Sequence, residues 1–231
     1  MSNLIGIDPS LISTAICING KLINYCRESD AYNKNGLAKW FKLAEQFINY
    51  KFIEYRKYKN YSEGEVIKLF DYDKITDSII NDIKSNIDTT LPTKVAIEGY
   101  SYSSDTSSII DLVTFSTLLR KKIVDELTDD IKIIAPSSLK QESCKLTYEP
   151  INIGKKKDKF EFRNNEGVAG GKFTKREMFL SIIENDKVNE LYSNHLRSIK
   201  SDILEVSKIP KPYEDSNDAY IIYQLLKHDK I

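Results

Sequence analysis

The fold is decided by residues 3–27, which read NLIGIDPSLISTAICINGKLINYCR. A short apolar run comes first, residues 12–18 then mix β-branched and small side chains, and residues 21–27 alternate apolar and polar ones. Asn19-Gly20 separates the last two runs, and an Asn-Gly pair between alternating runs is a strong signal for a β-hairpin. The chain is therefore predicted to open with three antiparallel strands.

The remainder alternates between helical and strand patterns. Apolar spacings of three and four predict helices over 37–58 and 73–87. Strand and helix signals then predict a strand at 94–97, a helix at 107–127, a strand at 131–135 and helices at 174–185, 188–207 and 215–228. Residues 141–171 are polar and lack periodicity, so we expect a mobile insertion there. A strand–helix–strand order implies parallel pairing with a right-handed crossover, which predicts an α/β fold with a mixed five-stranded sheet flanked by helices.

Composition limits the class of protein. The 231 residues are 41% hydrophobic, enough for one buried α/β domain covering 1–231, and 34 basic residues balance 34 acidic ones. Three cysteines without C-x-x-C spacing and two histidines predict no structural zinc and a reducing compartment. No apolar run approaches the ~18 residues of a membrane span, so we expect a cytoplasmic protein without a membrane partner.

Four carboxylates occupy three short contexts. Asp8 ends the first apolar run and Glu98 ends Val95-Ala-Ile-Glu98, while Asp215 and Asp218 lie three apart at the start of a helical pattern. Strand ends at one sheet edge commonly form the site in such folds, and residues three apart share a helix face. Because carboxylates are hard oxygen ligands, a fold that gathers them would bind divalent metal.

A purely structural interpretation exists for each acid. Asp8-Pro9 suits a turn, Glu98-Gly99 suits a strand exit, and Asp215 suits an N-cap with Asp218 in the first turn. Taken together, the four acids favour a metal site over these structural roles, because an acid at the end of a buried run is costly unless it is paired or metal-bound.

These motifs together resemble the RuvC family of Holliday-junction resolvases, including its phage and poxvirus members. The resemblance covers most of the chain in element order, which is that of the RNase H-like fold, but only short stretches in motif. Those stretches are Gly6-Ile-Asp-Pro9 with Ser13 and Thr14, Val95-Ala-Ile-Glu98, Ile134-Ala-Pro-Ser-Ser-Leu-Lys140, Gly170-Gly-Lys-Phe-Thr-Lys-Arg176 and Asp215-Ser-Asn-Asp218-Ala219.

The resemblance implies a Mg²⁺-dependent endodeoxyribonuclease that resolves four-way DNA junctions by paired phosphodiester hydrolysis. Asp8, Glu98, Asp215 and Asp218 would be catalytic and hold two Mg²⁺ ions, with Mn²⁺ as a substitute. The family acts as a homodimer on branched DNA, and a viral member would work in the host cytoplasm. Relative to the family, the chain carries extra residues at about 50–90 and 141–169, which leaves junction specificity and dimer geometry open.

The same resemblance suggests residues that contact nucleic acid. Lys172 or Lys175 would contact the phosphate backbone. Lys140, at the end of the 134–140 motif, and Arg176, at the end of the 170–176 motif, are further expected contacts with nucleic acid. Tyr100 and Tyr102 follow Glu98 and could stack on an unpaired base, worth ~1–3 kcal/mol, or one of them could cap the core. The Lys155-Lys-Lys157 run is either a solvated surface or a phosphate contact.

Three other functions compete with junction resolution. An RNase H-like ATPase shares the first motif, but it needs a duplicated domain and a second glycine-rich loop, and this chain has nine glycines. Another metal nuclease of the same fold could act on RNA, flaps or forks, because surrounding loops select the substrate. A binding protein that has lost catalysis is disfavoured by the presence of all four acids.

Overall fold

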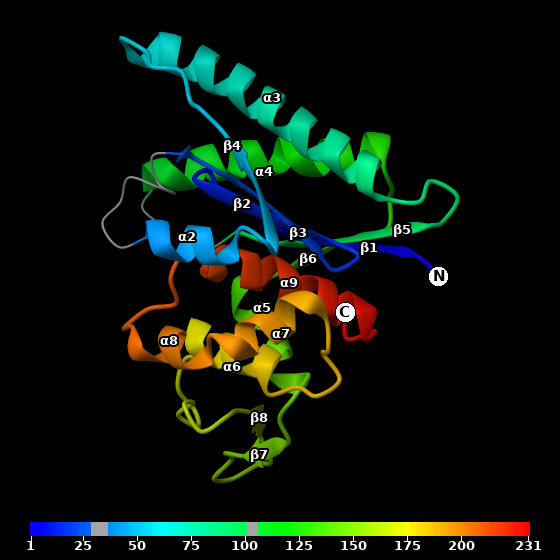
Figure 1. Ribbon diagram of the computed structural model, residues 1–231, viewed down its shortest axis with the longest axis vertical. Helices are drawn as coiled ribbons and strands as arrows, with labels where there is room; N and C mark the ends of the chain where they lie inside the picture. Colours follow the sequence, from blue (N-terminus) through cyan, green and yellow to red (C-terminus); the bar gives the residue numbers. More distant parts are fainter. Residues whose placement is uncertain (29–36, 101–105) are drawn as a thin grey trace.

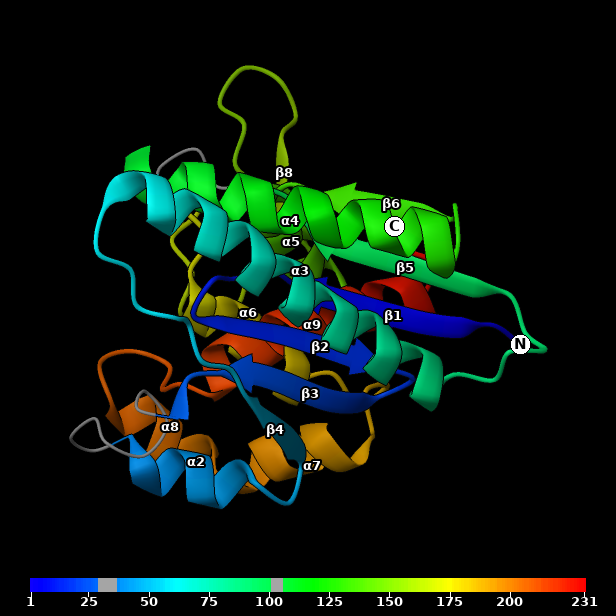
Figure 2. The ribbon, with the colours of Figure 1, turned by 90° about the horizontal axis from the view of Figure 1, so that it is seen from above.

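A computed structural model of the protein describes residues 1–28, 37–100 and 106–231. Its centre is a mixed sheet with the strand order β4-β3-β2-β1-β5-β6 (Figures 1 and 2). The strands are β1 (Asn3–Asp8), β2 (Ser13–Ile18), β3 (Lys21–Cys26), β4 (Ile48–Phe52), β5 (Thr93–Glu98) and β6 (Ile131–Ile134). β1, β2 and β3 pair antiparallel, and the other pairs are parallel. This is the predicted RNase H-like arrangement, with a sixth strand in addition to the predicted five.

The hairpin between β2 and β3 forms as predicted. Asn19 and Gly20 have φ angles of 49° and 88°, in the left-handed region that Asn and Gly tolerate best. Two successive positive φ angles match the right-handed twist of the flanking strands. The turn is also tied to β1, because Leu4 N donates to Asn19 Oδ1 at 2.9 Å.

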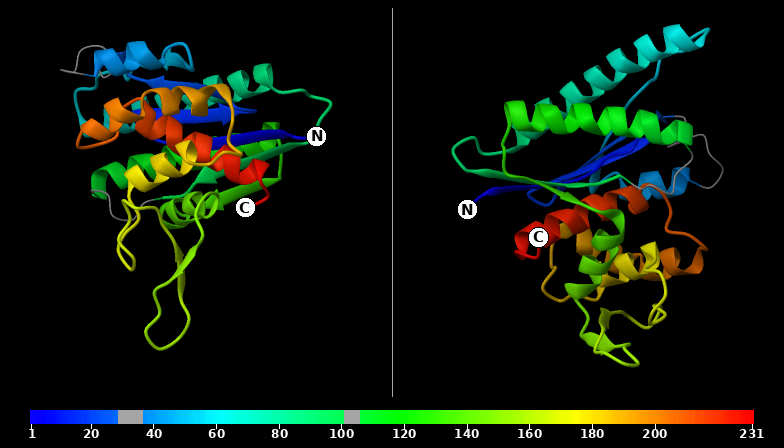
Figure 3. Two further views of the ribbon diagram at one scale, coloured as in Figure 1. Left: turned by 60° about the horizontal axis from the view of Figure 1, so that its bottom comes forward. Right: turned by 180° about the vertical axis from the view of Figure 1, so that it is seen from behind.

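Helices cover both faces of the sheet (Figures 1 and 3). They are α2 (Ala38–Ala44), α3 (Tyr61–Asn86), α4 (Thr106–Glu126), α5 (Pro136–Lys145), α6 (Lys175–Ile183), α7 (Leu191–Ser198), α8 (Lys200–Glu205) and α9 (Tyr213–Lys227). α3 and α4 pack on one face, whereas α9 lies on the other with α5, α6 and α7 beyond it. Across the described ranges, every helix is too short or too polar to cross a lipid bilayer.

The predicted helix over 37–58 is wrong beyond residue 44. Residues 48–52 form β4, which pairs in parallel with β3. The apolar spacing at Phe47, Ile48 and Phe52 also suits a strand, since short apolar runs do not distinguish the two. The exposed edge of β3 supplies backbone partners for a strand that a helix would leave unused.

α3 is longer than the predicted helix over 73–87 and begins at Tyr61. Its start is fixed by Asn60, whose side chain accepts a hydrogen bond from Glu63 N at 3.0 Å. The first turns of α3 were missed because their apolar side chains do not all face the core. Tyr61 is 79% exposed and Phe70 is 59% exposed.

The segment predicted as a mobile insertion contains regular structure. α5 occupies its start, and a two-stranded sheet follows, formed by β7 (Pro150–Asn152) and β8 (Phe160–Phe162). The predicted helix over 174–185 forms as α6 and starts with a capping box between Thr174 and Glu177. The predicted helix over 188–207 is split into α7 and α8, because Ile199 leaves the helical conformation with φ −108° and ψ 14°.

Gly6 of β1 allows α9 to lie directly on the sheet. A Cβ placed on Gly6 would be 2.3 Å from Ala219 O and 2.5 Å from Tyr223 N. Both atoms belong to the backbone of α9, so they cannot move aside as a flexible side chain could. A side chain at residue 6 would therefore push α9 away from β1.

We predict that Gly6→Ala destabilises the protein by about 3 kcal/mol or more, because overpacking against backbone atoms cannot be relieved by a rotamer change. Chemical denaturation of the metal-free protein measures the difference.

Gly170→Ala is the matched control for this substitution. Gly170 has φ 78°, but no atom of the described residues lies within 4 Å of the place that a Cβ would occupy. Only the left-handed backbone is therefore penalised in this variant, by about 1–2 kcal/mol. Equal losses in the two variants would contradict the packing explanation for Gly6.

Candidate metal centre

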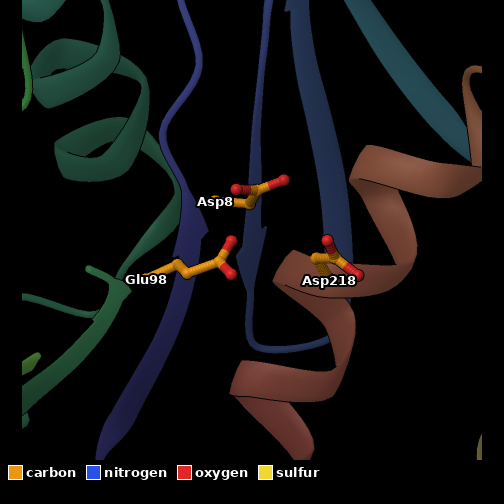
Figure 4. Close-up of side chains that lie close together, drawn as sticks. All are labelled: Asp8, Glu98 and Asp218. Atoms are coloured by element: carbon orange, nitrogen blue, oxygen red, sulfur yellow. The ribbon is translucent and has the colours of Figure 1, made fainter. Parts of the chain in front are cut away.

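Three carboxylates from distant parts of the chain meet at one edge of the sheet. Asp8 ends β1, Glu98 ends β5, and Asp218 lies in the second turn of α9. One oxygen of each lies within 4.8 Å of an oxygen of the other two. Figure 4 shows the three side chains converging from the two strand ends and the helix.

The strand register brings Asp8 and Glu98 together. β1 and β5 run parallel with Ile7 opposite Ile97, so the next residue of each strand reaches the same edge. Because side chains alternate along a strand, Ile7 and Ile97 enter the core under α3 and α4. Asp8 and Glu98 consequently point to the opposite face, where α9 supplies Asp218.

Burial and mutual repulsion make this cluster electrostatically unfavourable without a cation. Asp8 is 8% exposed and Asp218 is 2% exposed. Desolvation raises the pKa of Asp8 well above its ordinary value, and the charges of Glu98 and Asp218 raise it further. Desolvation also raises the pKa of Asp218, to about 7, despite the opposing effect of Lys175.

Lys175 is the first residue of α6 and places its ammonium group at this cluster. Its Nζ donates a hydrogen bond to Asp218 Oδ2. Burial alone would lower the pKa of Lys175, but the charges of Asp218 and Asp8 raise it above its ordinary value. Lys175 was predicted as a phosphate contact, and in the structure its positive charge lies beside the carboxylates themselves.

Asp215 lies one turn before Asp218 on α9 but is not part of the group of three within 4.8 Å. The helix begins at Tyr213, so Asp215 belongs to its first turn and the alternative interpretation as an N-cap is wrong. Lys211 Nζ donates a hydrogen bond to Asp215 Oδ1 at 3.3 Å and lies 3.1 Å from Oδ2. The buried Oδ2 has no hydrogen-bond partner among the described residues. Asp215 therefore retains an oxygen that could accept a ligand.

The residues present fit a divalent cation. Carboxylate oxygens are the ligands that Mg²⁺ and Mn²⁺ prefer, and three of them lie close enough together to share one ion. A cation would offset the repulsion that raises the pKa of Asp8. Asp8, Glu98 and Asp218 would hold it, and Asp215 could complete the set.

Tyr100 is the one of the two predicted stacking residues that the structure describes. Tyr100 is half-buried and attached to α4: its hydroxyl lies 3.0 Å from Thr117 Oγ1, and the Arg120 guanidinium lies 4.3 Å from its ring centre. One face of the ring is thus already occupied by a cation. Tyr102 lies outside the described residues.

The remaining predicted contact residues surround the start of α6 and α5. Lys172 is exposed, and Lys140 is half-buried on α5. Arg176 Nη2 donates to Leu204 O at 2.7 Å, and its Nε lies 3.5 Å from Glu166 Oε2. Arg176 is therefore engaged within the protein, whereas the charge of Lys172 faces solvent.

Two residues at this edge were not predicted from the sequence. Lys211 pairs with Asp215 four residues later, a spacing that could have identified it. Arg120 donates through Nη2 to Glu98 O at 3.2 Å and so fixes the end of β5. No sequence pattern indicated Arg120, because it reaches the site from the middle of α4.

We predict that divalent metal stabilises the folded protein, and more strongly at about pH 8 than at about pH 6. The folded-state pKa of Asp218, about 7, exceeds the ~3.9 of an unfolded aspartate. Protonated Asp218 therefore stabilises the folded protein at low pH, and this contribution to the free energy of unfolding is lost as the pH rises through about 7. Metal competes with that proton, and at 100 times its Kd would add about 2.7 kcal/mol.

The free energy of unfolding is measured in urea, with Mg²⁺ and with EDTA, at the two pH values. Asp8→Asn is the control because it removes one of the three carboxylates of the cluster. The amide keeps the shape but removes one charge, so Asp8→Asn should be more stable than the natural protein in EDTA near pH 8 and should lose most of the response to Mg²⁺. Burial lowers the pKa values of His195 and His228, so their contribution to stability increases as the pH rises, opposite to that of Asp218. The effect of pH is therefore taken as the difference between the natural protein and Asp8→Asn, in which the histidines are the same. An unchanged Mg²⁺ response in Asp8→Asn would contradict the site.

Comparison with known proteins gives structural matches alone. No family model matches the chain, and no curated protein matches its sequence. RuvC of T. thermophilus, solved in complex with a Holliday junction substrate, matches with TM-score 0.45 and 10% identity over 96% of this chain and 90% of that chain. The yeast mitochondrial Holliday junction resolvase Ydc2 matches with TM-score 0.43 and 12% identity over 98% and 81% of the two chains.

Proposed function

We propose that this protein is a Mg²⁺-dependent, structure-specific endodeoxyribonuclease that cuts four-way DNA junctions. The observation that supports this most directly is the convergence of Asp8, Glu98 and Asp218 within 4.8 Å. Buried carboxylates without metal are costly, and the pKa of Asp8 is raised accordingly. Such a cluster is therefore better explained as a cation site than as part of the core.

Two bound divalent ions would activate a water molecule and stabilise the charge that develops on a phosphodiester. The protein's own contribution is positioning. The ends of β1 and β5 fix Asp8 and Glu98 through the sheet register, and Arg120 holds the backbone of Glu98. Lys175 places a positive charge beside Asp218, and we propose that this charge orients and neutralises a phosphate bound at the same cluster.

The choice of a four-way junction follows from the motifs that resemble the RuvC family, since the cluster itself accounts only for phosphodiester chemistry. Symmetric cleavage of a junction requires two sites at a fixed separation, and we therefore propose that the protein acts as a homodimer. The same cluster on a different surface would serve a nuclease of flaps, forks or RNA. Cleavage of a panel of substrates separates these alternatives.

We predict Mg²⁺-dependent paired nicks at the branch point of a four-way junction. Labelled junction, fork, flap and linear duplex are incubated with the protein in Mg²⁺, and the cuts are mapped on denaturing gels. Asp8→Asn, Glu98→Gln and Asp218→Asn should each reduce cleavage to background while circular dichroism shows an unchanged fold. Equal cutting of all four substrates would reduce the proposal to a general nuclease, and no cutting of any would refute it.

We also predict that Asp215 acts as a metal ligand and not solely as the ion-pair partner of Lys211. Asp215→Asn should lower the cleavage rate by more than the roughly 10- to 100-fold that loss of an outer-sphere partner costs. It should also reduce the number of Mn²⁺ ions bound in calorimetric titration. Lys211→Met keeps the carboxylate and removes its partner, so it should retain full Mn²⁺ stoichiometry.

Equal effects of Asp215→Asn and Lys211→Met on both rate and stoichiometry would show that Asp215 acts through the ion pair. Asp215→Asn conserves side-chain length and Lys211→Met shortens the side chain by one atom, so differences in packing should be small. Unfolding in urea verifies that both variants fold.

A further inference from the structure

The β7–β8 hairpin carries a concentrated positive charge away from the carboxylate cluster. Its loop, residues 153–159, contains four exposed lysines, Lys155, Lys156, Lys157 and Lys159. Figures 2 and 3 show this hairpin projecting from the body of the protein. Within the described ranges, no carboxylate forms an ion pair with Lys155, Lys156 or Lys157, and Lys159 Nζ lies 3.9 Å from Glu161 Oε1. The charge is therefore available to an external anion.

The loop has a defined conformation that presents these lysines. Asn152 Oδ1 accepts hydrogen bonds from Gly154 N at 2.9 Å and from Lys159 N at 3.3 Å. Asn152 Nδ2 donates to Asp158 Oδ1 at 2.8 Å, which turns the loop's one acidic side chain back to the strand. Gly154 allows the chain to close, since a Cβ there would lie 1.8 Å from Lys157 O.

A buried ionic network fastens the base of the hairpin to α6. Arg163, 5% exposed and next to the end of β8, contacts Glu161 at 3.0 Å and Glu177 at 2.8 Å. Its guanidinium also donates to Gly171 O and lies 3.8 Å from the ring centre of Phe173. Because removing one member of a buried ion pair leaves an uncompensated charge, this attachment is firm.

The same turn of α6 links the hairpin to the candidate metal centre. Glu177 binds Arg163 through one oxygen, and its other oxygen accepts from Thr174 N at 2.8 Å in the capping box. Lys175 lies between Thr174 and Glu177 in the sequence, and its side chain pairs with Asp218. The position of the hairpin and the position of Lys175 are thus set by one rigid unit.

We propose that Lys155, Lys156, Lys157 and Lys159 bind the phosphate backbone of a DNA duplex arm that extends from the cleaved junction; this inference rests on the proposed nuclease function. The protein has no net charge, and its cluster of acids repels DNA, so a polyanion must be held by local positive charge. A run of lysines without base-reading side chains suits phosphate contacts, which carry no sequence information. The hairpin therefore adds affinity and orientation to the arm and leaves sequence preference unchanged.

The test compares two triple variants with equal loss of charge. Lys155/Lys156/Lys157→Ala removes the hairpin charge, and Lys21/Lys94/Lys230→Ala removes three exposed lysines at the opposite end of the sheet, where β1 begins and α9 ends. Both are combined with Asp8→Asn to prevent cleavage, and binding of a labelled four-way junction is measured by fluorescence anisotropy at several salt concentrations.

We expect the hairpin variant to bind about 10-fold or more weakly and its plot of log Kd against log salt to lose a slope of about 2 to 3, at roughly 0.9 per phosphate contact. The control variant should bind as the Asp8→Asn protein does. Equal binding by both variants, or an equal loss in both, would overturn the proposal. Thermal unfolding confirms that the loop substitutions leave the fold intact.

Cleavage by the protein with its natural Asp8 and lysines is measured in parallel. Hairpin-dependent binding without any cleavage would refute the nuclease function and leave the DNA contact standing. Cleavage of the junction with no dependence of binding on the hairpin would refute the contact and leave the nuclease function standing.

Discussion

The fold and the candidate site both depend on the close contact between Gly6 and the backbone of α9. A hydrogen in place of a side chain at residue 6 lets Ala219 O and Tyr223 N approach β1. Asp8 follows two residues later on the same face of the strand, and Asp218 precedes Ala219 on the helix. The separation between helix and sheet therefore fixes the separation between these carboxylates. A glycine deep in the core is thus part of the geometry of the candidate metal centre.

The cost of gathering carboxylates is partly offset by two lysines. Lys175 contacts Asp218 and Lys211 contacts Asp215, so both aspartates of α9 have a basic neighbour. Asp8 has no equally close cation among the described residues, which agrees with the large increase in its pKa. The arrangement is strained electrostatically in the absence of metal and is suited to binding it. The carboxylate cluster therefore lowers the stability of the metal-free fold at the site where the chemistry is proposed, as is common at functional sites.

The segment between α5 and α6 is held by charge rather than by an apolar core. Its two strands are short and largely exposed, and so few of its side chains can be buried that packing alone would not define its position. Its position is fixed instead by the ion pairs of Arg163 with Glu161 and Glu177, because buried charges must find their partners. An insertion attached in this way can project from the protein while its base stays fixed relative to Lys175.

By itself, the sequence determined the local features: the Asn19-Gly20 hairpin, the strands ending in Asp8 and Glu98, and a helix bearing Asp215 and Asp218 three apart. These follow from turn chemistry and from the periods of strands and helices, which act over a few residues. The tertiary structure alone decided that residues 48–52 join the edge of β3, that Lys175 and not Lys140 or Arg176 meets the carboxylates, and that Asp215 stays outside the closest three. Those outcomes depend on which surfaces pack together, and packing is set by partners far away in the chain.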